Sequence, residues 1–126
     1  MRMYCLTTYR APALVIAALW GRFSEEEVHC LCRDLDRQML RGDGGPPSML
    51  LDLGRMEPQG EAVVALLYRY VERSVEAGVR VARVVENRLV AHELERVAEG
   101  AGLLDRLRTF AERDSALVWV RAPAAV

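Results

Sequence analysis

The sequence predicts a single α/β domain with a mixed, mostly parallel β-sheet of about five strands and about four helices. Short apolar segments rich in β-branched residues alternate along the chain with amphipathic segments of helical period. The chain has 126 residues, no internal repeat and no long linker, which indicates one domain over residues 1–122 and a disordered tail at 123–126. The expected order is ββαβαβαβα, with right-handed crossovers between parallel strands.

The first two strands are expected to form an antiparallel pair. Met3 to Tyr9 is rich in aromatic and β-branched residues, and Leu14 to Trp20 is a nearly continuous apolar run. The connection between them is short, as in a hairpin rather than a crossover.

A capping box marks the start of the first helix. The Ser24 hydroxyl can accept a hydrogen bond from the Glu27 amide, and the Glu27 side chain can reach back to Ser24. Helical spacing then gives one apolar face, formed by Val28, Leu31, Cys32, Leu35 and Met39. We expect this helix to end at Gly42 and a loop to follow at 44–47.

The middle of the chain predicts the central strand and the second helix. Ser48 to Leu53 is a short buried strand, and a tight turn follows it. The helix from Glu61 to Ala77 is expected to end at Gly78, a residue suited to the left-handed conformation. Its inward face carries Val63, Leu66, Leu67, Tyr70 and Val71.

The last third predicts two strands and one or two helices. Val79 to Val85 is a strand that Arg80 and Arg83 interrupt, and Leu107 to Phe110 is a second, short strand. Asn87 caps a helix with a shared apolar face of Val90, Leu94, Val97 and Ala101. Residues 112–120 have the start of a helix but end with the composition of a strand, and we favour the helix.

The charge balance argues against a nucleic-acid or membrane-surface partner. The chain has 17 basic and 18 acidic residues and a net charge of −1, so it has no strong field to attract a polyanion. Its longest uncharged run, Ala11 to Gly21, is far shorter than the roughly 20 residues of a membrane helix. The amino terminus lacks the pattern of a signal peptide. We expect a cytoplasmic protein without membrane insertion.

The cysteines and histidines do not predict a metal site. His29, Cys30 and Cys32 are too close together along one helix to converge on a tetrahedral ion. His92 has no nominated partner for acid–base chemistry. We therefore expect no metal, no cofactor and no enzymatic activity.

The candidate site is the segment that joins the central strand to the second helix, with Asp52, Glu57, Pro58, Gln59 and Gly60. α/β domains bind their ligands at the carboxyl ends of strands and the amino ends of helices. A partner- or ligand-binding surface is one interpretation of these residues. The other is structural, because Glu57 favours the positive end of the helix, Pro58 fixes the turn and Asp52 can orient it as a hydrogen-bond acceptor.

Four segments, in this order and spacing, resemble the STAS superfamily, named for sulfate transporters and anti-sigma-factor antagonists. They are the strand at Leu14–Gly21, the "LDL" strand at Leu50–Leu53, the strand entry at Ala77–Val85 and the segment Gly102–Leu107. The resemblance covers the chain from Leu14 to Trp119. The chain also resembles the divergent STAS/SEC14-like branch of small bacterial proteins.

The resemblance implies a non-enzymatic regulatory or protein-interaction module. In family members the turn after the LDL strand carries a serine or threonine that a partner kinase phosphorylates. Glu57 to Gly60 occupy that place here in a shorter turn, and no hydroxyl is among them, so the phospho-switch serine is missing.

The implied partner is a protein, with a kinase-type or sigma-factor regulator and a second copy of the chain as candidates. The alternative is a small-molecule or lipid carrier of SEC14-like type, which predicts an apolar cavity beneath the helices.

Overall fold

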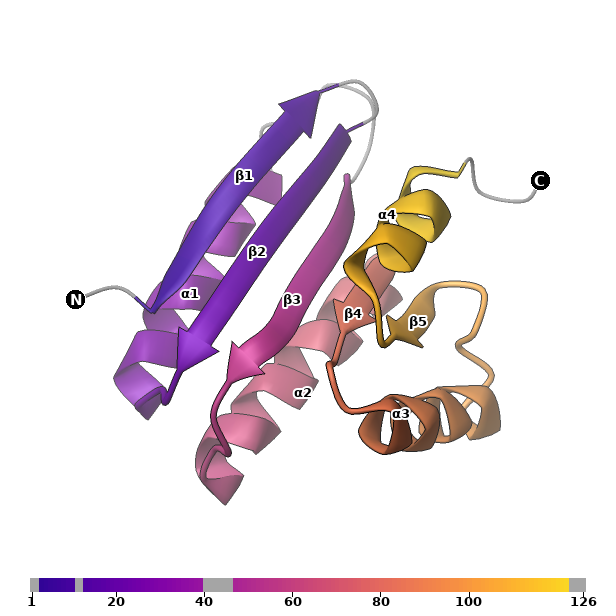
Figure 1. The fold of residues 1–126 in the computed structure, drawn as a ribbon. Helices are drawn as coiled ribbons and strands as arrows, with labels where there is room; N and C mark the ends of the chain where they lie inside the picture. Colours follow the sequence, from indigo (N-terminus) through magenta and orange to yellow (C-terminus); the bar gives the residue numbers. More distant parts are fainter. Residues whose placement is uncertain (1–2, 11–12, 40–46, 123–126) are drawn as a thin grey trace.

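The computed structural model describes residues 3–10, 13–39 and 47–122 and has one sheet of five strands in the order β1-β2-β3-β4-β5 (Figure 1). β1 and β2 are antiparallel, and each later strand is parallel to its predecessor. The predicted α/β class and the mostly parallel sheet with one antiparallel pair are confirmed. The strands are β1 (Tyr4–Arg10), β2 (Ala13–Gly21), β3 (Ser48–Met56), β4 (Val81–Val84) and β5 (Leu107–Phe110).

Helices cover the two faces of the sheet unequally (Figure 1). α1 (Glu25–Met39) and α2 (Glu61–Glu76) lie together on one face, and α4 (Arg113–Arg121) packs on the other, against β3, β4 and β5. α3 (Arg88–Gly100) lies beside β5. The segment 112–120 is compatible with helix or strand by its sequence. In the structure all of it except residue 112 belongs to α4, so it is helical.

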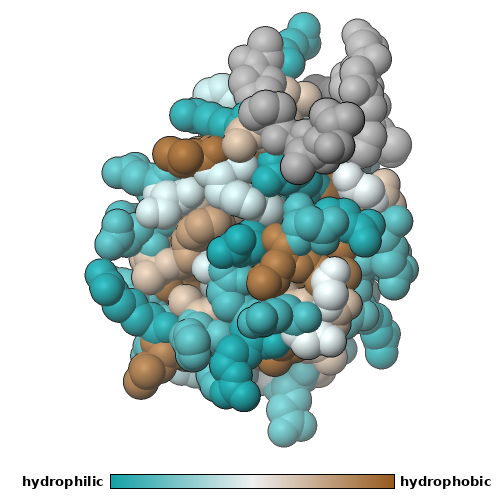
Figure 2. Space-filling model, turned by 90° about the vertical axis from the view of Figure 1, so that its right-hand side faces the viewer, coloured by the Kyte–Doolittle hydropathy of each residue, from teal (hydrophilic) through white to brown (hydrophobic). Residues whose placement is uncertain are grey.

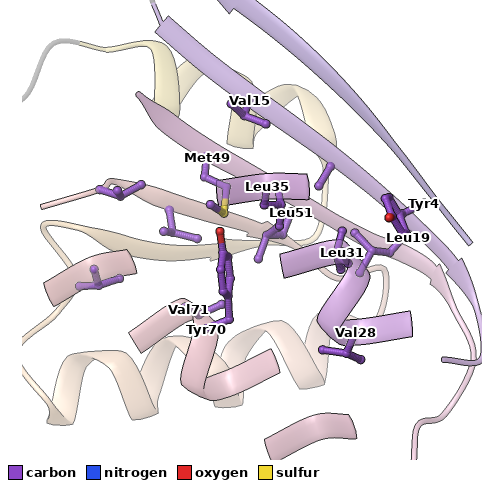
Figure 3. Packing of buried hydrophobic residues seen from close by; sticks show 14 of the residues in the cluster. Tyr4, Val15, Leu19, Val28, Leu31, Leu35, Met49, Leu51, Tyr70 and Val71 are labelled. Carbon is purple, nitrogen blue, oxygen red and sulfur yellow. The ribbon is translucent and has the colours of Figure 1, made fainter. Parts of the chain in front are cut away.

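The core has two parts because the sheet is apolar on both faces. The larger part lies under α1 and α2, where Figure 3 shows Met49 and Leu51 of β3 facing Tyr70 and Val71 of α2. The smaller part lies under α4 and contains Leu14, Ile16, Leu50, Ala82, Val84, Ala116 and Val120. Alternate residues of one strand enter different parts, as the two-residue period of a strand requires.

The predicted helix signals form the expected hydrogen bonds. The Glu27 amide donates to Ser24 Oγ (3.1 Å), and the Ser24 amide donates to Glu27 Oε1 (3.0 Å), which completes the capping box. Asn87 Oδ1 accepts from two amides at the start of α3. Gly78 has a φ of 93°, in the left-handed region where glycine is favoured.

Two strands differ from the prediction by two or more residues at one end. β3 continues to Met56 rather than ending at Leu53, because β2 extends beside it and pairs Gly21 with Met56 after a shift in register. β4 begins at Val81 rather than Val79. The Val79 amide donates to the carbonyl of Ser74, so this residue closes the end of α2 and does not join the sheet.

The apolar face predicted on α3 is not the side that packs most closely. Ala91 and Ala98 are buried, whereas Val90 is 45% and Val97 is 64% exposed. α3 lies beside β5, a strand of only four residues at the edge of the sheet. The small side chains of the alanines allow the helix to approach this strand closely. Part of the apolar stripe therefore remains at the surface.

Three predicted features lie outside the described residues: the end of the first helix at Gly42, the loop residues 44–46 and the tail 123–126. Within the described part of the chain, no helix is long and apolar enough to cross a bilayer.

Candidate functional site

The turn of residues 57–60 joins β3, the middle strand of the sheet, to α2. β3 runs parallel to both of its neighbours, so the turn leaves the sheet at the carboxyl edge where α/β domains bind ligands. This is the position of the predicted contact surface.

Gln59 attaches the turn to the end of β2. Its side-chain oxygen accepts a hydrogen bond from the Phe23 amide (2.8 Å), and its side-chain nitrogen lies 2.8 Å from the Gly21 carbonyl oxygen and 2.6 Å from that of Glu57. The Glu57 amide donates to the same Gly21 oxygen (3.0 Å). All partners of Gln59 are backbone groups, so it acts as a clamp on the path of the chain.

The other turn residues face solvent. Glu57, Pro58 and Gly60 are exposed. Gly60 is the N-cap of α2 and supplies no side-chain hydrogen bond to the helix. Among the described residues, no ion pair involves Glu57. The turn therefore presents a carboxylate and a proline ring beside the first turn of α2.

Asp52 lies apart from the turn, on the α4 side of the sheet. Its Oδ1 accepts a hydrogen bond from the Gly54 amide (3.1 Å), and its Oδ2 pairs with Arg113 Nη1 of α4 (3.1 Å). Because side chains alternate between the two faces of a strand, Asp52 lies on the same face of the sheet as Leu50, which packs beneath α4. The candidate residues are thus divided between two environments, with Asp52 paired to α4 and Gln59 facing the α1–α2 side.

An apolar cavity of about 190 Å³ lies between the sheet, α1 and α2. Its polar lining consists of Cys32, Gln59, Tyr68, Tyr70 and Arg83. Ten apolar residues form the rest: Leu19, Leu31, Leu35, Leu51, Leu53, Met56, Val64, Leu67, Val71 and Leu94. Gln59 is therefore shared by the turn and the cavity.

Arg83 is a buried cation in this cavity, and sequence reasoning did not assign it a role. It is 5% exposed and sits in the middle of β4. Its Nε donates to Thr109 Oγ1 of β5 (3.1 Å). Burial lowers the pKa of Arg83, and the nearby Tyr68 and Glu95 partly oppose that shift. The sequence signal that could have identified this residue is a single arginine with two apolar residues on either side of it in a predicted strand.

Cys32 and Tyr70 line the cavity beside one acidic residue. The Tyr70 hydroxyl donates to Asp36 Oδ1 (2.8 Å). Burial, with that hydrogen bond and the charge of Asp36, raises the pKa of Tyr70. Burial and the charge of Asp36 raise the pKa of Cys32 from 9.0 to about 11, while Arg73 acts in the opposite sense. Cys32 is thus a protonated thiol at neutral pH and a poor nucleophile.

Alkaline pH is expected to destabilise the fold through these two groups. Well below pH 9.0 the Cys32 thiol is protonated in both the folded and the unfolded chain. Between pH 9.0 and about 11 the unfolded chain loses this proton while the folded chain keeps it, so the free energy of unfolding falls as pH rises. Urea denaturation at several pH values measures this slope.

Cys32→Val is expected to make the alkaline slope shallower, and the raised pKa of Tyr70 accounts for the remainder. Cys5→Val is the matched control, because it makes the same replacement at an exposed thiol. A slope in Cys32→Val equal to that of the wild type contradicts the expectation.

Within the described residues, no group of three or more histidine, cysteine or acidic side chains is placed to hold a metal ion. Cys30 Sγ lies 3.3 Å from Arg33 Nη2, one turn further along the same helix.

Exposed apolar residues also occur away from this site. Leu89 and Val97 of α3 are 79% and 64% exposed, and Val118 of α4 is 74% exposed. Figure 2 views the molecule from the side of these elements and shows apolar groups as separate patches among hydrophilic ones.

Comparison with known proteins found no matching family model and no matching curated sequence. Solved structures do match. An uncharacterized DUF3478-family protein with a SpoIIAA-like fold, from Shewanella loihica PV-4, has a TM-score of 0.69 at 14% identity, over 93% of this chain and 91% of that one.

The anti-sigma factor antagonist SpoIIAA in its unphosphorylated form has a TM-score of 0.67 at 12% identity, over 95% of this chain and 99% of that one. An anti-sigma factor antagonist from Mycobacterium paratuberculosis has a TM-score of 0.58 at 18% identity, over 94% and 93% of the two chains. These matches extend over almost the whole of each chain, and the protein has the SpoIIAA-like fold of the anti-sigma-factor antagonists.

Proposed function

We propose that this protein is a non-enzymatic regulatory module that binds a protein partner through the turn at Glu57–Gly60 and the exposed side of α2. The observation that carries the proposal is the clamped turn, which holds exposed groups in a fixed position at the carboxyl edge of the sheet. A surface that is ordered before binding loses less conformational entropy when a partner docks.

The exposed side of α2 supplies suitable contact residues. Val64 and Tyr68 are 38% and 40% exposed, and the charged Arg69 is exposed next to them. Tyrosine and arginine are enriched among the residues that dominate binding energy at protein interfaces. The solved neighbours include anti-sigma factor antagonists, which supports an anti-sigma factor or a related kinase as the class of partner.

The proposed module differs from a phosphorylation switch. One solved neighbour is SpoIIAA of Bacillus in its phosphorylated form. In this chain no serine or threonine occurs from Leu53 to Tyr70, and the first hydroxyl after the turn is on Tyr68. We therefore propose that binding is not controlled by a phosphoserine or phosphothreonine in the turn.

Site-specific photo-crosslinking in the native cells tests this proposal. A photoreactive phenylalanine analogue at Glu57 or Tyr68 is expected to capture one defined protein, identified by mass spectrometry as an anti-sigma factor or kinase. The same analogue at Val118, which is exposed on α4, is the control and should not capture that protein. Tyr68→Ala should then weaken binding of the captured protein about tenfold.

Two outcomes contradict the proposal. Equal capture at Val118 and at Tyr68 shows that contact is not confined to this surface. A crosslinked product with twice the mass of the chain shows that the surface binds a second copy instead.

The cavity favours a second candidate function, that of a small-molecule carrier. An almost wholly apolar lining with a few polar groups is typical of ligand pockets. At about 190 Å³ the cavity is smaller than the roughly 300–1,000 Å³ of pockets for drug-sized ligands, so it fits a small molecule better than a whole lipid.

A further inference from the structure

We infer that the cavity beneath α2 binds a small monocarboxylic acid, with the carboxylate held by Arg83 and the apolar body enclosed by aliphatic side chains. This inference rests on the carrier function proposed above and names its ligand class. It does not depend on the protein partner.

The hydrogen bonds of Arg83 leave most of its guanidinium available to a ligand. Nε is bound to Thr109 Oγ1. Among the described residues, neither Nη1 nor Nη2 has a hydrogen-bond partner, and no carboxylate forms an ion pair with Arg83. Buried charged groups are normally paired, and a planar guanidinium matches a carboxylate in two parallel hydrogen bonds.

The acidic residues Glu95 and Asp36 each have one side-chain partner other than Arg83. Glu95 is the acidic residue whose charge acts on Arg83. Its Oε1 is paired with Arg108 Nε at 2.9 Å, and its Oε2 is buried without a hydrogen-bond partner. Asp36 accepts the hydrogen bond of Tyr70. Among the described residues no carboxylate is within ion-pair distance of Arg83, so a ligand with one negative charge suits its two guanidinium nitrogens that have no protein partner.

The volume limits the body of the acid. An apolar cavity of about 150 Å³ holds one benzene molecule, so about 190 Å³ fits one aromatic ring or a chain of about six carbons. Leu19, Leu51 and Leu94 supply walls from β2, β3 and α3. The body of the ligand would thus be surrounded by aliphatic carbon.

The ligand has a route from solvent along α2. Val64 and Tyr68 both line the cavity and are 38% and 40% exposed. The mouth is therefore beside these residues, on the surface proposed to bind a partner. Gln59, which clamps the turn, also lines the cavity.

Titration of the full chain with phenylacetate and hexanoate tests the inference, with phenylacetamide and hexanamide as neutral controls of the same shape. Calorimetry at pH 7 and native mass spectrometry measure binding. We expect the acids to bind at least about tenfold more tightly than the amides, since hydrogen bonds to a charged group contribute at least this factor.

Each result of these titrations has a distinct meaning. Equal affinity for acids and amides overturns recognition of the carboxylate but leaves the carrier function intact. No binding of any probe overturns both. Tighter binding of phenyl phosphate than of phenylacetate overturns the assignment of a single negative charge.

Three variants separate the role of Arg83 from general effects. Arg83→Met keeps an apolar stem in the cavity and is expected to abolish the preference for acids while amide binding continues. Arg96→Met removes an exposed arginine of α3 and should keep the preference. Val64→Trp fills the mouth of the cavity and should weaken the binding of acids and of amides alike.

Retention of the acid preference in Arg83→Met overturns the inference, and unchanged affinities in Val64→Trp show that the probes bind elsewhere. If Arg83→Met does not fold, as judged by circular dichroism, the comparison of acids with amides and the Val64→Trp titration still decide the question.

Discussion

Gln59→Ala is expected to lower the free energy of unfolding by about 2 kcal/mol and to free the turn that joins β3 to α2. The substitution removes three hydrogen bonds and leaves the Phe23 amide without its acceptor. A typical hydrogen bond contributes about 0.5–1.5 kcal/mol net, and an unsatisfied buried group costs more. Urea denaturation measures the loss of stability.

Hydrogen exchange distinguishes a local effect of Gln59→Ala from a general one. The amides of Phe23 and Glu57 are expected to exchange faster in the variant, whereas amides in the middle of β3 change only with global stability. Gln38→Ala is the matched control, because Gln38 accepts one exposed hydrogen bond from Thr8. A loss in Gln59→Ala no larger than in Gln38→Ala contradicts the clamp.

Leu50→Ala is expected to lower the free energy of unfolding by about 3 kcal/mol, a larger loss than that of Gln59→Ala. Leu50 is 0% exposed and packs under α4 with Ile16 and Ala116. Removing a buried leucine side chain costs the transfer free energy of its carbons and leaves a cavity, together about 2–5 kcal/mol. Thermal and urea denaturation, both followed by circular dichroism, measure the change.

Leu89→Ala is the control for Leu50→Ala. Leu89 is 79% exposed on α3, so the same substitution there should change stability by no more than about 0.5 kcal/mol. Similar losses in the two variants would show that the smaller part of the core, beneath α4, does not stabilise the fold as its burial indicates.

Local sequence signals predicted the elements well because short-range chemistry determines them. Ser24 and Glu27 form their hydrogen bonds within one turn of α1, and Asn87 caps α3 in the same way. Gly78 ends α2 because few other residues tolerate its backbone conformation. Such signals depend only on neighbours in the chain.

The boundaries that differ from the prediction depend on distant partners. The strand at Met56 exists because Gly21, far away in sequence, pairs with it. Val79 leaves the sheet because a carbonyl in α2 accepts its amide. Neither partner can be identified from the local composition of the strand.

The candidate site was predictable in position but not in its contacts. The sequence placed Gln59 in the turn, but its partners at Gly21 and Phe23 lie on another segment. It gave no sign of the cavity's shape, which arises where β3, β4, α1 and α2 pack together. Arg83 appeared only as an interruption in a strand, because Thr109 is its neighbour only in three dimensions.

The clamp at Gln59 also affects how this surface can evolve. Gln59 binds only backbone atoms, so substitutions at Phe23 or Glu57 leave the chemistry of its partners in place. Glu57 and Pro58 are exposed, and the clamp uses none of their side-chain atoms. A lineage can therefore change the residues displayed on this turn, and with them its partner, while the shape of the turn is inherited unaltered.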